Sequence, residues 1–91
     1  MSTKQGYEVR DEVWNEVQRA MDCYAPFASA HEGYAVILEE VRELEAEVFK
    51  SPRRRSYQKM YTEARHVAAM AIRFMLDVDD KLCTSESVED A

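Results

Sequence analysis

This sequence is poor in the residues that interrupt helices, and it lacks long apolar runs. Its 91 residues include two glycines and two prolines, and no segment alternates polar and apolar residues as a half-buried strand does. No apolar run approaches the roughly 20 residues needed to cross a bilayer, and the first residues lack the apolar core of a signal peptide. We therefore expect an all-α cytoplasmic protein that does not bind membranes.

Cysteine and positive charge are also scarce. Cys23 and Cys83 are too few for a secreted disulfide framework and show no Cys-x-x-Cys spacing, which favours reduced thiols, in the core or at the surface. The formal net charge is −6, whereas nucleic-acid binding needs a broad basic face. We therefore expect no nucleic-acid partner, while an acidic surface remains compatible with cation binding.

Apolar residues recur at three- and four-residue spacings in three segments, over about residues 8–25, 30–49 and 57–82. The first helix must end near Pro26, because a proline disfavours helix at the residue before it. Ser29 and Glu32 form a capping-box pattern that predicts the start of the second helix, with Glu32 reaching back to Ser29. The break near residues 50–56 offers Ser51 or Ser56 as the cap of the third helix.

These helices predict one domain over residues 1–83, followed by a polar, acidic tail over 84–91 that we expect to be disordered. The second and third helices form a hairpin, and the N-terminal helix is added to it. Three helices with wide apolar faces make an incomplete bundle, and a second copy of the chain would close the hairpin into a four-helix core. We therefore expect a homodimer, or a homotetramer built as a dimer of dimers.

Glu40 and Glu43 stand out on the second predicted helix. Residues three and four positions apart are neighbours on a helix, and neither glutamate has a basic neighbour there. Glu39, by contrast, can reach Arg42. Each like-charge pair costs roughly 0.2–0.5 kcal/mol, so a bound cation would relieve the repulsion around Glu40 and Glu43. The alternative is an ordinary solvated acidic face.

Glu63 and His66 lie one turn apart at the corresponding edge of the third apolar stripe. Metal sites in helical bundles are built from facing side chains on neighbouring helices. Together with Glu40 and Glu43, these residues predict a divalent-cation site between the two helices. The alternative for His66 is an interior histidine that is satisfied by hydrogen bonds.

A basic cluster follows the second predicted helix and comprises Lys50, Arg53, Arg54, Arg55 and Lys59. Guanidinium groups match phosphate oxygens well, so the cluster is a candidate phosphate-binding loop. A solvated turn between two acidic helices is the alternative.

The acidic pairs lie in HEGYAVILEEVRELEAEVF, which contains Glu40-Val41-Arg42-Glu43, and in EARHVAAMAIRFMLDV, which begins at Glu63. Over about residues 30–79 the chain resembles the MazG-like all-α nucleoside triphosphate pyrophosphohydrolases, in particular short, phage-type members. The resemblance implies metal-dependent hydrolysis of a nucleoside triphosphate to the monophosphate and pyrophosphate with Mg²⁺. It also implies that Glu40, Glu43 and Glu63 hold the metal, and that Glu39 or Glu43 accepts the proton of the attacking water.

His66 departs from this pattern, because the family has aspartate at the corresponding position. Magnesium prefers oxygen ligands in octahedral geometry, whereas imidazole suits Mn²⁺, Zn²⁺ or Ni²⁺ better. Two expectations follow. Either the protein is an active pyrophosphohydrolase with an altered metal preference, or it is a catalytically degenerate helical module that acts in protein interaction or dimerisation.

Overall fold

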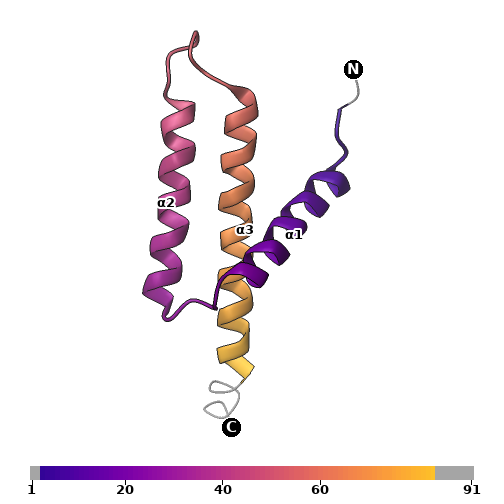
Figure 1. Ribbon diagram of the computed structural model, residues 1–91, viewed down its shortest axis with the longest axis vertical. Coiled ribbons are helices and arrows are strands. Elements are labelled where there is room, and N and C mark those ends of the chain that lie inside the picture. The colour runs from indigo at the N-terminus through magenta and orange to yellow at the C-terminus, as the bar shows by residue number, and fades with distance from the viewer. Residues whose placement is uncertain (1–2, 84–91) are drawn as a thin grey trace.

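The computed structural model describes residues 3–83 as three helices, α1 (Gly6–Cys23), α2 (Ala30–Val48) and α3 (Tyr57–Lys81). Figure 1 shows that α2 and α3 form an antiparallel hairpin and that α1 crosses α3 at an inclined angle. No strand occurs within residues 3–83. The expectation of an all-α hairpin with an added N-terminal helix is thus confirmed, while the tail predicted at 84–91 lies outside the described residues.

Serine hydroxyls cap the start of both hairpin helices. Ser29 Oγ accepts a hydrogen bond from the Glu32 N–H at 3.1 Å, and Ser56 Oγ accepts one from the Lys59 N–H at 3.2 Å. Ser56, rather than Ser51, is therefore the cap of α3. The Glu32 carboxylate bonds the N–H of Ala28 at 2.8 Å, one residue before the Ser29 N–H that a regular capping box would use.

The first helix ends at Cys23, two residues before the predicted end. Tyr24 has extended backbone angles, and the residue that precedes Pro26 is biased away from helix. Side chains of α3 then hold the turn: Arg73 Nη2 donates to the carbonyl oxygen of Ala25 at 3.1 Å, and Asp77 Oδ2 accepts from the N–H of Phe27 at 3.0 Å. The turn between α1 and α2 is thus attached to the central helix.

The helix α3 is the centre of the packing. It packs against both α1 and α2, whereas α1 and α2 do not pack against each other. The buried apolar core is correspondingly small and comprises Val17, Ala20, Ala69 and Met70. Residues at the far ends of the predicted stripes, such as Tyr24, are exposed, because a stripe is buried only where its helix meets α3.

The resulting molecule is elongated. It measures 56 × 27 × 25 Å and has a radius of gyration of 16.1 Å, compared with about 12 Å for a compact chain of this length. Many large apolar side chains remain exposed within residues 3–83, among them Trp14, Tyr34, Val41, Phe49 and Met75. A single chain thus leaves much apolar surface in water.

None of the helices within residues 3–83 has the length and apolar character needed to cross a membrane. Cys23 and Cys83 are both exposed, so the surface position, rather than the core position, holds for both thiols.

Gly33 of α2 lies close to the aromatic rings of Phe74 and Phe27. A Cβ atom at this position would lie 2.6 Å from Phe74 Cδ1 and 3.0 Å from Phe27 Cδ2. We expect Gly33→Ala to lower the free energy of unfolding by about 1–3 kcal/mol through overpacking, although alanine gains about 1 kcal/mol in helix propensity. Gly6→Ala is the matched control, because nothing lies within 4 Å of its added methyl group. Urea denaturation measures both variants, and equal effects at the two positions would contradict the prediction.

Candidate metal centre and adjoining cavity

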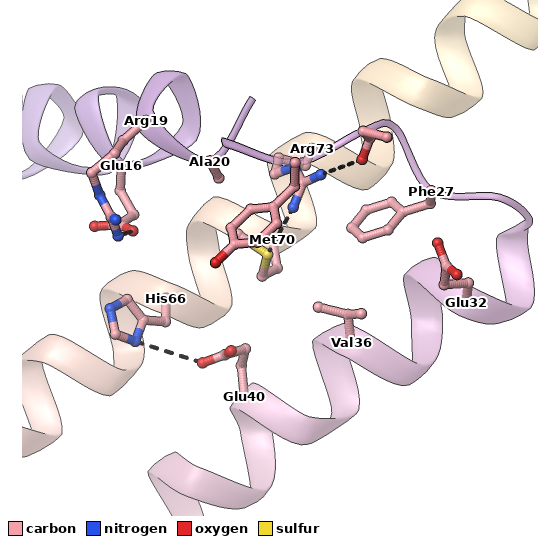
Figure 2. A pocket seen from close by; sticks show the side chains of 12 residues that line it. Glu16, Arg19, Ala20, Phe27, Glu32, Val36, Glu40, His66, Met70 and Arg73 are labelled. Atoms are coloured by element: carbon pink, nitrogen blue, oxygen red, sulfur yellow. Dashed lines mark hydrogen bonds and ion pairs between the residues drawn. The ribbon is translucent and has the colours of Figure 1, made fainter. Parts of the chain in front are cut away.

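The hairpin brings three potential metal ligands together. Glu63 and His66 lie one turn apart on α3, and Glu40 faces them from α2. His66 Nδ1 lies 3.6 Å from Glu40 Oε2 and 3.6 Å from Glu63 Oε2. One ligand atom from each residue lies within 4.8 Å of the others, and Figure 2 shows the side chains of Glu40 and His66 pointing toward one another. We call Glu40, Glu63 and His66 the ligand triad.

Two carboxylate oxygens of the ligand triad lack a hydrogen-bond donor in the part of the chain that the structure describes. Glu40 Oε2 and Glu63 Oε2 are buried and accept no hydrogen bond from residues 3–83, and the two side chains are only 22% and 24% exposed. A buried acceptor without a donor costs roughly 1–3 kcal/mol, and more when it is charged. The pair therefore requires either protons or a cation.

The pKa of Glu40 is shifted in these buried surroundings. It is raised from its ordinary value of 4.5 to about 7. Burial is the main cause, followed by a side-chain hydrogen bond with Glu43 and the negative charge of that residue, and the positive charge of His66 only partly opposes the rise. Near neutral pH the carboxyl of Glu40 thus holds a proton part of the time, and a bound metal cation would replace that proton.

Arg65, which lies between Glu63 and His66 in the sequence, pairs with α1 instead of with the ligand triad. Arg65 Nη1 lies 3.7 Å from Glu12 Oε1, and Arg65 Nε lies 3.9 Å from Glu16 Oε1, both on α1. Tyr61 also donates to Glu12 at 2.7 Å. These contacts attach α1 to α3 beside the ligand triad and leave Arg65 unable to neutralise it.

The donor set of the ligand triad fits a divalent cation, since two carboxylate oxygens and one imidazole nitrogen converge on a partly buried position. An oxygen-only set would be typical of magnesium, and the imidazole shifts the preference toward Mn²⁺ or Zn²⁺. Glu43 does not join this group. It is exposed, one turn beyond Glu40, and shares a hydrogen bond with it. Glu39 is exposed and lies outside the group.

Four members of the basic cluster predicted to bind phosphate occupy the loop between α2 and α3, at the far end of the hairpin from the turn between α1 and α2 (Figure 1), whereas Lys59 lies in the first turn of α3, four residues before Glu63. Lys50 Nζ binds both carboxylate oxygens of Glu47 at 3.0 Å, and Arg55 Nη2 donates to the Lys50 carbonyl at 3.2 Å. Arg53, Arg54 and Lys59 are exposed. Lys50 lies ten residues after Glu40, on the order of 15 Å along the helix axis at 1.5 Å per residue. The structure therefore does not bring this loop to the ligand triad.

A cavity of about 400 Å³ adjoins the ligand triad. It exists because α1 and α2 both pack against α3 but not against each other, and all three helices line it. Glu40 and His66 lie on its wall, as do Phe27, Met70 and Arg73 (Figure 2). Sequence reasoning missed Arg73, although its spacing of seven residues from His66 places both on one face of a helix.

Known proteins provide no template for the ligand triad and its cavity. Comparisons of this chain with protein-family models, with curated proteins and with solved structures give no match.

Proposed function

We propose that this protein is a divalent-cation-dependent hydrolase that cleaves a nucleoside triphosphate to the monophosphate and pyrophosphate, in the manner of the MazG-like enzymes that it resembles. The observation that carries the proposal is the convergence of Glu40 and Glu63 on His66, with two buried carboxylate oxygens that lack hydrogen-bond donors. The adjoining cavity of about 400 Å³ supports it by providing space for a small-molecule substrate.

The roles of the residues follow from their positions. Glu40 and Glu63 would hold the cation through Oε2, and His66 through Nδ1. A bound divalent cation neutralises phosphate charge and lowers the pKa of water. Glu40 would release its proton when the cation binds, because its pKa is raised mainly by burial and a nearby positive charge favours the ionised carboxylate.

Glu43 is the better candidate for proton acceptor. It is exposed and shares a hydrogen bond with Glu40, whereas Glu39 is exposed and lies outside the ligand triad. In the proposed reaction a water oxygen attacks the α-phosphorus, the α–β phosphoanhydride bond breaks, and pyrophosphate leaves. The water proton passes to the Glu43 carboxylate. The choice of the α–β linkage rests on the resemblance of the paired acidic motifs.

Pyrophosphate release tests the proposal. Canonical and modified nucleoside triphosphates would be assayed with Mn²⁺, Mg²⁺ or Zn²⁺, and with a chelator. We expect metal-dependent release, and we expect Glu63→Gln to lower kcat/KM by roughly 100-fold or more, since even residues that only support metal ligands contribute 10–100-fold. Glu45→Gln, at an exposed position on the same hairpin, should behave as the wild type. Release that is unchanged in the chelator would rule out the proposal.

One observation favours a second function. The imidazole of His66 lies equally close to both carboxylates of the ligand triad, so a protonated His66 can itself supply the positive charge. The protein would then be a catalytically degenerate helical module that acts in protein interaction or dimerisation. Absence of turnover with every metal, together with absence of cation binding, would favour this function.

Either function includes assembly of two or four chains. The elongated shape and the exposed apolar residues of α2 and α3 support a four-helix bundle that is completed by a second copy. Light scattering should give twice or four times the chain mass of 10.6 kDa. We expect Val41→Glu, at the middle of α2, to dissociate the assembly, because it would place a charge in an apolar interface. Ala46→Glu, at an exposed position on α2, is the control. A monomeric mass for the wild type would contradict the prediction.

A further inference from the structure

Arg73 is a buried cation on the wall of the cavity. Arg73 is 6% exposed, and Figure 2 shows its side chain above Met70 and close to Phe27. Nη2 donates to the Ala25 carbonyl at 3.1 Å, Nη1 contacts Met70 Sδ at 3.6 Å, and the guanidinium carbon lies 4.5 Å from the centre of the Phe27 ring. Within residues 3–83, no carboxylate forms an ion pair with Arg73.

This environment gives the guanidinium no ion-pair partner within residues 3–83: Asp77, one turn further along α3, lines a second pocket with Arg73, but its carboxylate accepts the N–H of Phe27. A guanidinium carries five N–H donors, and in the part of the chain that the structure describes Arg73 forms two donor contacts, one of them to sulfur, which is a weak acceptor. A carbonyl oxygen and an aromatic face compensate a buried positive charge only in part, and burial of a cation without an anion is unfavourable. Arg73 therefore retains both charge and donor capacity for an anion.

The other charged residues on the cavity wall do not supply that anion. Glu16 pairs with Arg19, and the carboxylate of Glu32 accepts a hydrogen bond from the backbone of Ala28 at 2.8 Å. Glu40 belongs to the ligand triad. The cavity therefore has acidic side chains at its cation-binding end and a guanidinium without an ion pair at the other.

The two ends are aligned along α3. Arg73 follows His66 by seven residues, which places both on one face of the helix and separates them by about 10 Å along its axis at 1.5 Å per residue. A chain of linked phosphates has the matching chemistry, because its oxygens bind divalent cations as well as guanidinium groups. The net charge of −6 opposes general anion binding, so an anion that does bind must be held by local contacts.

We propose that Arg73 is the phosphate-binding residue of this cavity, and that it holds one phosphate of a polyphosphate whose chain extends toward the ligand triad. This inference rests on the proposed function and assigns the anion-binding end of the same site. It replaces the exposed loop around Arg53 and Arg54 as the place where phosphate is bound. A planar guanidinium can bind two phosphate oxygens at once, which the ammonium group of lysine cannot reproduce.

Inorganic pyrophosphate is the probe, because it carries linked phosphates and lacks a base and sugar. Calorimetry would be performed in a chelator, so that Arg73 is tested without metal. We expect Arg73→Met to weaken binding by more than about 30-fold and Arg73→Lys by about tenfold, through loss of the planar fork. Arg54→Met, on the exposed loop, should change the affinity by less than about twofold.

Arg73 also contacts the turn between α1 and α2, so its substitutions could impair folding. Circular dichroism checks the variants, and NMR of the wild-type protein gives an independent result. With ¹⁵N-labelled arginine, the Nε–H signal of Arg73 should shift on addition of pyrophosphate, while those of Arg53 and Arg54 should remain in place. A purely structural arginine would not respond to the anion.

Two results would overturn the inference: no binding of pyrophosphate by the wild type, or binding that shifts the loop arginines and leaves Arg73 unchanged. These results are separable from the outcome for the proposed function. Metal-dependent pyrophosphate release with an unresponsive Arg73 would reject only the phosphate-binding role. Binding at Arg73 without turnover by any metal would reject only the hydrolase.

Discussion

Glu40→Gln should make the metal-free protein more stable above pH 7 and abolish its stabilisation by Mn²⁺. The pKa of Glu40 is raised to about 7 in the folded protein, compared with an ordinary value of 4.5. Between these values the folded state binds more protons than the unfolded state, so the free energy of unfolding falls as pH rises from about 4.5 to about 7 and is constant above that range. The loss should amount to roughly 1–3 kcal/mol, and glutamine, which does not ionise, removes it.

The cation should act in the opposite direction. A ligand that binds only the folded state raises the free energy of unfolding by about 2.7 kcal/mol at 100 times its Kd. Since the cation replaces the proton of Glu40, its affinity should fall up to tenfold per pH unit below about 7. Glu40→Gln retains the shape of the side chain but loses its negative charge, so we expect no shift of Tm with Mn²⁺.

Glu39→Gln is the matched control, because Glu39 is exposed and lies outside the ligand triad. Urea denaturation between pH 5 and 8, with and without Mn²⁺, should show wild-type behaviour for this variant. A Glu40→Gln protein that is still stabilised by Mn²⁺ would place the cation elsewhere. A wild-type protein whose stability does not change between pH 5 and 7 would show that Glu40 is not protonated in the folded state.

His66→Asp should change the metal preference of the protein. The substitution converts the ligand triad into three carboxylates, and oxygen-only sites suit magnesium better than sites with imidazole. We expect the ratio of the Mg²⁺ affinity to the Zn²⁺ affinity to rise by about tenfold or more, which corresponds to about 1.4 kcal/mol or more. The metal-free variant should lose about 1–3 kcal/mol of stability, within the usual range for a destabilising substitution, because three carboxylates repel one another.

Calorimetric titration with each metal measures the preference, and pyrophosphate release measures its consequence. His31→Asp makes the same chemical change at an exposed position in the first turn of α2 and should alter neither. A metal preference that changes less than twofold in His66→Asp would remove His66 from the site. Turnover that appears in His66→Asp and is absent from the wild type would identify the natural protein as the degenerate module.

The number of helices and their approximate ends could be predicted from sequence, because the signals for both are local. Apolar spacing gave the three helices, Pro26 limited the first, and the hydroxyls of Ser29 and Ser56 begin the other two. What could not be predicted was which face of each helix is buried. The apolar stripes are wider than the contacts with α3, so residues such as Tyr34 and Met75 belong to a stripe and remain exposed in the single chain.

The same distinction applies to the candidate site. Glu40, Glu63 and His66 could be proposed from spacing within each helix, because residues three apart share a face. Glu43 has the same spacing from Glu40, but the rotation of α2 against α3 leaves it outside the ligand triad, and sequence contains no measure of that rotation. Arg73 could not be identified from sequence because its contacts come from two distant segments, Met70 of α3 and the turn between α1 and α2 with Ala25 and Phe27.

The separation of α1 from α2 affects how a ligand can enter. One wall of the cavity belongs to α1, which among the helices of the described chain packs against α3 and is joined to α2 by the turn at residues 24–29. The ligand triad belongs entirely to the hairpin. A swing of α1 about that turn would therefore widen the entrance while the ligand triad keeps its geometry, whereas Arg73, which donates to the carbonyl oxygen of Ala25 in the turn, would be affected by the movement.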